Sequence, residues 1–149
     1  MPKAAESVNL ADSFEKIPVK VYKDLHEGSV FAAKMIAALI KEKQSKKEKC
    51  VLGLATGSTP KTLYAELVRM HKEEGLSFKN VISFNLDEYY PIDHDALQSY
   101  NCYMHRHLFD HIDMDPKNIH IPNGELPKES IKAHCLDYEK KIEEVGGID

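Results

Sequence analysis

The sequence predicts an α/β fold in which helices flank a mainly parallel sheet. Short apolar runs that indicate buried strands alternate with longer segments of helical periodicity. Glycine, proline and small polar residues separate the two kinds of segment. This alternation is typical of parallel strands joined by crossover helices. The length of 149 residues suits one compact domain.

The first segments predict an arm, a short strand and a helix. We expect residues 1–17, which are polar and alanine-rich, to form a flexible arm, and residues 18–149 to form the domain. Residues 19–22 predict a short strand. Asp24 suits a helix cap, and the helix it starts should run out in the lysine-rich stretch 41–49. The inward stripe predicted for this helix is Leu25, Val30, Phe31, Met35, Ala38 and Leu39.

Two buried strands enclose the next helix. The continuous apolar run 50–55 predicts the first strand, and residues 81–86 predict the second. Between them, Pro60 suits the first turn of a helix that Thr59 can cap and Gly75 can end. The inward residues predicted for this helix are Leu63, Leu67, Val68 and Met70.

The rest of the chain predicts a short strand between two helices. Helical spacing covers residues 99–111, a strand is expected at 119–121, and a last helix covers 129–145. A glycine pair, 146–147, then follows, and such a pair usually leads into another strand. We therefore expect a Rossmann-like sheet that is truncated before its later strands. The inward residues of the last helix are expected to be Ile131, Cys135, Tyr138 and Ile142.

The composition argues against several classes of protein. A net charge of -4 does not favour nucleic acid or an anionic membrane as a partner. The most apolar stretch, residues 31–40, contains Lys34 and is too short to cross a bilayer. Cys50, Cys102 and Cys135 are isolated and odd in number, so we expect reduced thiols in a cytoplasmic protein.

The strongest chemical motif is the turn between the first buried strand and its helix, the Thr56–Thr59 loop. A helix start leaves backbone N–H groups unpaired, and its dipole favours anions. Gly57 allows close approach of a ligand, and the hydroxyls of Thr56, Ser58 and Thr59 can donate hydrogen bonds. We expect these four residues to bind a small phosphorylated ligand. The alternative is a turn whose hydroxyls only cap the helix. The glycine spacing matches no nucleotide-binding fingerprint.

A second motif, Asp87-Glu88, follows the next strand. If the two strands are neighbours, Asp87 lies beside the Thr56–Thr59 loop and can act as a general base on the ligand. Adjacent carboxylates in an extended segment point to opposite faces, so only one of them should face the ligand. The alternative is a pair of solvated acids that end the strand.

The histidine-rich segment 105–111 invites a metal interpretation. His107 and His111 are four residues apart, but there is no HExxH pattern and no cysteine pair. We expect no metal here. Leu108 and Phe109 should instead belong to the core, with the histidines partly exposed.

In these motifs the chain resembles the glucosamine-6-phosphate deaminase/isomerase family. The resemblance runs through residues 53–60, 76–89 and 99–120 and covers roughly residues 20 to 149. It implies a cytoplasmic hydrolase of amino-sugar metabolism that converts glucosamine 6-phosphate and water to fructose 6-phosphate and ammonia. By this resemblance the Thr56–Thr59 loop binds the phosphate, and Asp87 moves a proton between C1 and C2. No metal or cofactor is needed, because acid–base groups suffice.

The chain departs from the family pattern in its missing later half. The family's ring-opening histidine would follow Asp149, so this chain alone is expected to be inactive, and Ala55 stands where proline is common. One alternative is a non-catalytic sugar-phosphate-binding or regulatory domain. Another is a 6-phosphogluconolactonase-like hydrolase, which residues 87–89 and 104–106 match less well. We expect a small sugar phosphate as partner, and neither nucleic acid nor membrane. Whether the protein forms a homo-oligomer is left open by the sequence.

Overall fold

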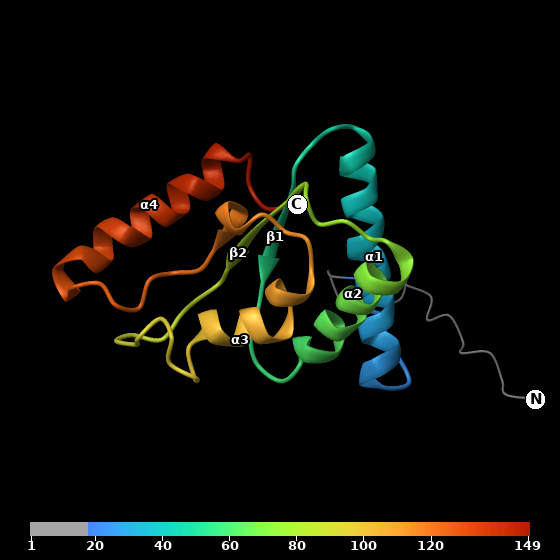
Figure 1. Ribbon diagram of the computed structural model, residues 1–149, viewed down its shortest axis with the longest axis horizontal. Helices are drawn as coiled ribbons and strands as arrows, with labels where there is room; N and C mark the ends of the chain where they lie inside the picture. The colour runs from blue at the N-terminus through green and yellow to red at the C-terminus, as the bar shows by residue number, and fades with distance from the viewer. Residues whose placement is uncertain (1–17) are drawn as a thin grey trace, which may run out of the picture.

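The computed structural model describes residues 18–149 and has a parallel sheet between layers of helices (Figure 1). The sheet has the order β1-β2-β3, and both strand pairs are parallel. The strands are β1 (Cys50–Leu54), β2 (Val81–Asn85) and β3 (Ile119–His120). The predicted α/β class is therefore confirmed, whereas the arm predicted at residues 1–17 lies outside the described residues.

One face of the sheet carries the larger core. The helices that contribute to it are α1 (Leu25–Ser45), α2 (Pro60–Glu74) and α3 (Tyr100–His107). Ala33, Leu67 and Met104, one from each helix, are completely inaccessible to solvent. The sheet supplies Cys50, Leu52, Leu54 and Val81 to the same core. This apolar burial is the main source of stability available to the fold.

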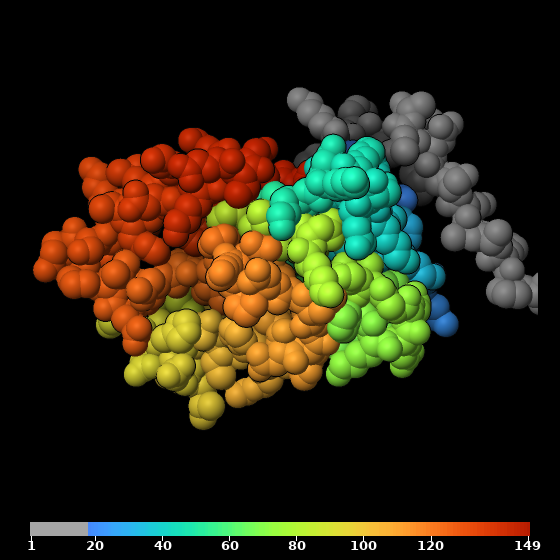
Figure 2. Space-filling model, turned by 45° about the horizontal axis from the view of Figure 1, so that its top comes forward, coloured from blue at the N-terminus to red at the C-terminus, as the bar shows by residue number. Residues whose placement is uncertain are grey.

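The other face of the sheet is covered by α4 (Ile131–Glu144). Tyr138 and Ile142 of this helix pack against Val51, Ile82 and Phe84. Figures 1 and 2 both place α4 at one end of the molecule and α1 with α2 at the other. Burial on this face is modest, because no residue of α4 is fully buried. Cys135, which was predicted to point inward, is exposed.

Local signals in the sequence set several helix ends. The Asp24 side chain accepts a hydrogen bond from the backbone N–H of Glu27 at 2.9 Å and so caps α1. Gly75 ends α2 in the left-handed region, with a φ of 72°. The single helix predicted over residues 99–111 is instead broken at Leu108. The chain then forms the 3₁₀ turn η2 (Phe109–His111). Two further 3₁₀ turns follow: η3 (Pro116–Asn118) directly before β3, and η4 (Lys128–Ser130) directly before α4.

Two predictions about the N-terminal region are wrong. Residues 19–22 form no strand, and Val21 is 90% exposed. A strand needs a partner for its backbone groups, and no strand of residues 18–149 pairs with this segment. The buried face of α1 also differs from the predicted stripe, since Leu25 and Met35 are exposed. The buried residues of α1 are Ser29, Ala33, Ala37 and Ile40.

Other expectations concern membranes and thiols. Across residues 18–149, none of the helices combines the length and the hydrophobicity needed to cross a bilayer. Cys50, Cys102 and Cys135 are not joined in disulfide bonds. Burial raises the pKa of the Cys50 thiol to about 11, with a smaller contribution from the nearby Asp149 carboxylate.

Candidate functional site

The register of β1 and β2 brings the two predicted motifs to the same edge of the sheet. Leu54 pairs with Asn85, so Thr56 and Asp87 each follow the paired position by two residues. Neighbouring strands lie about 4.8 Å apart. The pairing continues beyond the strand ends, because the backbone N–H of Leu86 donates to the Leu54 carbonyl at 3.2 Å. The loops after β1 and β2 therefore leave the sheet side by side.

The N-terminus of α2 forms the back of the Thr56–Thr59 loop. Thr59 has helical backbone angles and its side chain makes no capping hydrogen bond, so the predicted cap is wrong. Pro60 occupies the first turn, and that turn contains no acidic side chain. The backbone N–H groups of this turn thus lack a side-chain cap within the described residues, which favours an anion-binding loop over a simple capped turn.

Gly57 gives the loop its shape. Its φ of +104° lies in a region that residues with a side chain rarely adopt. No heavy atom lies within 4 Å of the place where a Cβ would be. Glycine is therefore required here by backbone conformation and not by a lack of space.

Two tyrosines hold the backbone carbonyl groups of Ala55, just before the loop, and of Gly57, within it. The hydroxyl of Tyr64, in α2, donates to the carbonyl of Ala55 at 2.5 Å. The hydroxyl of Tyr103, in α3, donates to the carbonyl of Gly57 at 2.5 Å. Burial raises the pKa of Tyr64 and of Tyr103, so both phenols stay protonated donors at neutral pH. The carbonyls of Ala55 and Gly57 are thereby directed towards tyrosine hydroxyls of α2 and α3.

A cavity of about 660 Å³ opens on one side of the loop. Thr56 and Thr59 line one wall, Leu25 and Ser29 of α1 line another, and Lys20 also lies at its lining. Gly57, Ser58 and Asp87 are not part of this lining. Of the four predicted phosphate-binding residues, the cavity therefore includes Thr56 and Thr59 and leaves out Gly57 and Ser58.

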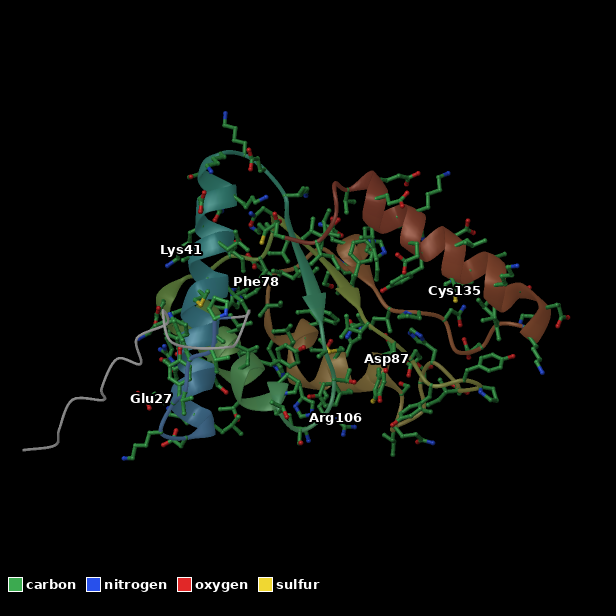
Figure 3. All side chains as sticks on the ribbon, turned by 180° about the vertical axis from the view of Figure 1, so that it is seen from behind. Glu27, Lys41, Phe78, Asp87, Arg106 and Cys135 are labelled. Carbon is green, nitrogen blue, oxygen red and sulfur yellow. The ribbon has the colours of Figure 1, made fainter. Side chains whose placement is uncertain are left out.

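Asp87 and Glu88 have different environments. The Glu88 carboxylate accepts hydrogen bonds from the backbone N–H groups of Tyr100 at 2.9 Å and of Asn101 at 3.0 Å. Asp87 is exposed, and its side chain has no hydrogen-bond or ion-pair partner among residues 18–149. Figure 3 shows it beyond the end of β2. The Glu88 carboxylate is thus occupied by backbone N–H groups and the Asp87 carboxylate is not, while the expectation that only one of them faces a ligand stays a prediction.

The histidines of the segment 105–111 take part in local contacts. His105 Nδ1 lies 2.7 Å from a carboxylate oxygen of Asp110, and His111 Nε2 lies 2.9 Å from the carbonyl oxygen of Arg106. Burial, followed by the charges of Lys61 and Arg106, lowers the pKa of His107. Within residues 18–149, no three His, Cys, Asp or Glu side chains converge as metal ligands.

Sequence reasoning missed the residues that support the two loops. Glu88 was considered as one of two solvated or ligand-facing acids, and Tyr103 only as part of the helix predicted over residues 99–111. The bond between Tyr103 and Gly57 joins residues 46 positions apart, and the bond between Tyr138 and Asn85 joins residues 53 positions apart. A tyrosine on a helix face signals burial in the sequence, but nothing there indicates which distant carbonyl its hydroxyl reaches.

Comparisons with known proteins agree with this architecture. Residues 24–148 match the family described as glucosamine-6-phosphate isomerases/6-phosphogluconolactonase. A glucosamine-6-phosphate deaminase-like protein of Bacteroides thetaiotaomicron is 45% identical over 99% of this chain and 22% of its own length. Glucosamine-6-phosphate deaminase 2 of Bacillus subtilis is 48% identical over 78% of this chain and 46% of its own length. The chain thus spans half or less of the length of these relatives.

Solved structures give the same picture of the fold. The structure of a monomeric glucosamine-6-phosphate deaminase is similar to 86% of this chain, with a TM-score of 0.79 and 41% identity, over 51% of that protein. The structure of a 6-phosphogluconolactonase from Thermotoga maritima is similar to 82% of this chain, with a TM-score of 0.65 and 24% identity, over 53% of that protein. The second similarity concerns the fold alone.

Proposed function

The chain belongs to the family of glucosamine-6-phosphate isomerases and 6-phosphogluconolactonases, and from this premise we propose that the full-length protein deaminates glucosamine 6-phosphate. The reaction consumes water and yields fructose 6-phosphate and ammonia. The observation that carries the proposal is the pairing of Leu54 with Asn85, which puts an uncapped helix start and a free carboxylate at adjacent strand ends. A phosphorylated sugar needs both features, one for its phosphate and one for its reacting carbons.

We assign phosphate binding to the Thr56–Thr59 loop. Backbone N–H groups at the start of α2 and the hydroxyls of Thr56, Ser58 and Thr59 would donate to the phosphate oxygens. Gly57 would let the phosphate approach the backbone, since no atom occupies the space beside its Cα. This assignment is supported by the carbonyls of Ala55 and Gly57, which are already bound to tyrosine hydroxyls and do not oppose an anion.

We assign proton transfer to Asp87. In the proposed route the carboxylate removes the proton from C2 of the open-chain amino sugar and returns it at C1. Loss of the C2 proton, with protonation of the C1 oxygen, gives an enolamine; return of the proton to C1 and loss of one amine proton give a ketose imine, which water hydrolyses with release of ammonia from C2. The free state of Asp87 supports this role, because the adjacent Glu88 carboxylate is occupied by backbone N–H groups of α3. General acid–base groups are sufficient for such a route.

The test is ammonia release from glucosamine 6-phosphate by the natural full-length protein. Asp87→Asn should lower kcat about 10²- to 10⁴-fold, the range typical of a positioned general base, and leave binding of the sugar phosphate measurable. The control is Asp95→Asn, which removes another exposed carboxylate in the loop after β2 and should leave kcat within about twofold. Full turnover by the Asp87→Asn variant would remove Asp87 from the mechanism.

Other outcomes separate the remaining functions. Binding of glucosamine 6-phosphate by a wild-type protein that releases no ammonia would favour a sugar-phosphate-binding or regulatory domain. Hydrolysis of 6-phosphogluconolactone in place of deamination would favour the lactonase branch named in the family description. The 41% identity with a deaminase of known structure favours deamination over this second activity.

A further inference from the structure

The N-terminus of α3 is capped by the carboxylate of Glu88, which lies in the loop that carries Asp87. Glu88 Oε1 accepts from the backbone N–H of Tyr100 at 2.9 Å, and Oε2 accepts from that of Asn101 at 3.0 Å. The Ser99 hydroxyl accepts a third N–H, that of Cys102, at 2.9 Å. A negative charge is favoured at this end of a helix. Since Asp87 directly precedes Glu88, these bonds restrict the backbone from which the Asp87 carboxylate projects.

The same helix holds the Thr56–Thr59 loop through Tyr103. Its hydroxyl donates to the carbonyl of Gly57, and its ring is flanked by two basic side chains. Lys61 Nζ lies 5.8 Å from the centre of the Tyr103 ring, and the His107 ring centre lies 4.5 Å away. The Tyr103 side chain is thereby held in one orientation, and the Gly57 carbonyl with it.

The interior side of α3 makes it a rigid connection. Met104 is completely buried, and Leu108 and Phe109, which follow the helix, are 3% and 6% exposed. These side chains belong to the core shared by α1, α2 and the sheet. Close-packed interiors transmit displacement because they contain little free space. A helix with this anchorage cannot shift at its N-terminus, which Glu88 holds, without moving Tyr103, one turn further along.

We propose that Glu88 and Tyr103 are positioning residues, and that α3 acts as a brace that fixes Asp87 relative to the Thr56–Thr59 loop. The inference rests on the proposed function, because it concerns the two halves of that same site. The phosphate and the C1–C2 unit lie at opposite ends of a hexose 6-phosphate. The separation of the loop from the Asp87 carboxylate therefore sets whether a bound substrate presents C2 to the base.

Kinetics of two conservative variants test the brace. Tyr103→Phe keeps the ring and loses only the bond to Gly57, so KM for glucosamine 6-phosphate should rise about threefold to tenfold with kcat nearly unchanged. Glu88→Gln keeps the size of the side chain but loses a charged acceptor of three N–H groups, those of Tyr89, Tyr100 and Asn101, so kcat should fall about tenfold. Because both act through α3, the double variant should lose less kcat/KM than the product of the two single losses.

Matched controls remove bonds of the same type that do not involve α3. Tyr90→Phe removes a tyrosine-to-carbonyl bond of 3.0 Å to Leu126, and Glu27→Gln alters a carboxylate that accepts the Lys23 N–H at 2.9 Å. Both should leave kcat and KM within about twofold of wild type. Losses in the double variant that multiply fully, or single losses no larger than those of the controls, would overturn the brace.

A measurement without turnover separates this inference from the proposed reaction. In the Glu88→Gln variant, the NMR chemical shift of the Gly57 carbonyl carbon should move towards its value in Tyr103→Phe, because that shift reports the hydrogen bond from the Tyr103 hydroxyl, although Glu88 does not touch the loop. An unchanged Gly57 shift would contradict the brace even in an active deaminase. A moved shift in a protein that releases no ammonia would uphold the brace and refute only the deaminase function.

Discussion

The hydroxyl of Tyr138 lies 2.9 Å from the backbone carbonyl oxygen of Asn85. It lies at the same distance from the carbonyl oxygen of His120. One side chain of α4 thus contacts the last residues of β2 and β3. Asp87 follows the end of β2 by two residues. The rings of Tyr138 and Phe84 add an edge-to-face contact, with centres 5.6 Å apart. The loop that carries Asp87 is consequently attached to the second layer of helices as well as to α3.

Removal of this hydroxyl should destabilise the protein. Tyr138→Phe keeps the ring against Phe84 but leaves the Asn85 carbonyl without its side-chain donor. We expect the free energy of unfolding to fall by about 1 kcal/mol. Denaturant unfolding measures the difference, and Tyr90→Phe serves as the comparison, because that tyrosine is 46% exposed and its loss should be smaller. Equal losses in the two variants would argue against a special role for the Tyr138 bond.

Substitution of Gly57 should separate binding from stability. Gly57→Ala forces a side chain onto a φ of +104°, which costs on the order of 1–3 kcal/mol or makes the loop change shape. Binding of glucosamine 6-phosphate should weaken at least about tenfold, which calorimetry can measure. The matched control is Gly75→Ala, at a φ of +72° with equally open space at the end of α2. The control should lose stability without losing affinity, and weakened binding by both would remove Gly57 from the phosphate site.

Asp113 should contribute to stability above about pH 4. Burial alone would raise the pKa of its carboxyl, but hydrogen bonds from Phe78 N–H and Ser77 and the nearby His71 together hold that pKa below its usual value. A carboxyl whose pKa is lower in the folded state stabilises the fold when ionised, and this contribution is lost as the pH falls through the folded-state pKa. Asp113→Asn should therefore lower the free energy of unfolding at pH 7 by on the order of 1 kcal/mol.

The pH profile of unfolding distinguishes this effect from simple loss of packing. Wild type should become less stable as the pH falls below about 4, and the difference between wild type and Asp113→Asn should shrink towards pH 2. A constant difference across this range would mean that the charge of Asp113 is not involved.

His120 should make the protein less stable in mildly acidic solution. Burial, and to a smaller extent the charge of Lys141, lowers the pKa of His120, whose ring stacks on Phe84 with centres 4.6 Å apart. The unfolded chain therefore binds a proton more readily, and stability falls as the pH drops through about 6.5. His120→Phe should make the free energy of unfolding less dependent on pH between about 7 and 5. An exposed histidine, His26, provides the control substitution His26→Phe, which should leave that dependence nearly unchanged.

Much of the fold could be predicted because its signals are local. Asp24 caps α1 and Gly75 ends α2 through bonds that involve only neighbouring residues. The apolar runs of β1 and β2 mark buried strands wherever they occur in a chain. Parallel strands bring their carboxyl ends to one edge, so the sequence could put Asp87 beside the Thr56–Thr59 loop on the condition that their strands are neighbours, and β1 and β2 do pair.

The sequence by itself therefore determined the three strands of the sheet and the approximate positions of the four helices, although it also predicted a strand at residues 19–22 that does not form. Only the tertiary structure decided which face of α1 is buried, since Ala33 rather than Met35 meets the core. It also decided the fates of two adjacent carboxylates, because Glu88 reaches the N–H of Tyr100, 12 residues away, and Asp87 does not. The physical reason is range: a cap or a turn is fixed by neighbours in sequence, whereas a partner across the fold exists only after the elements have packed.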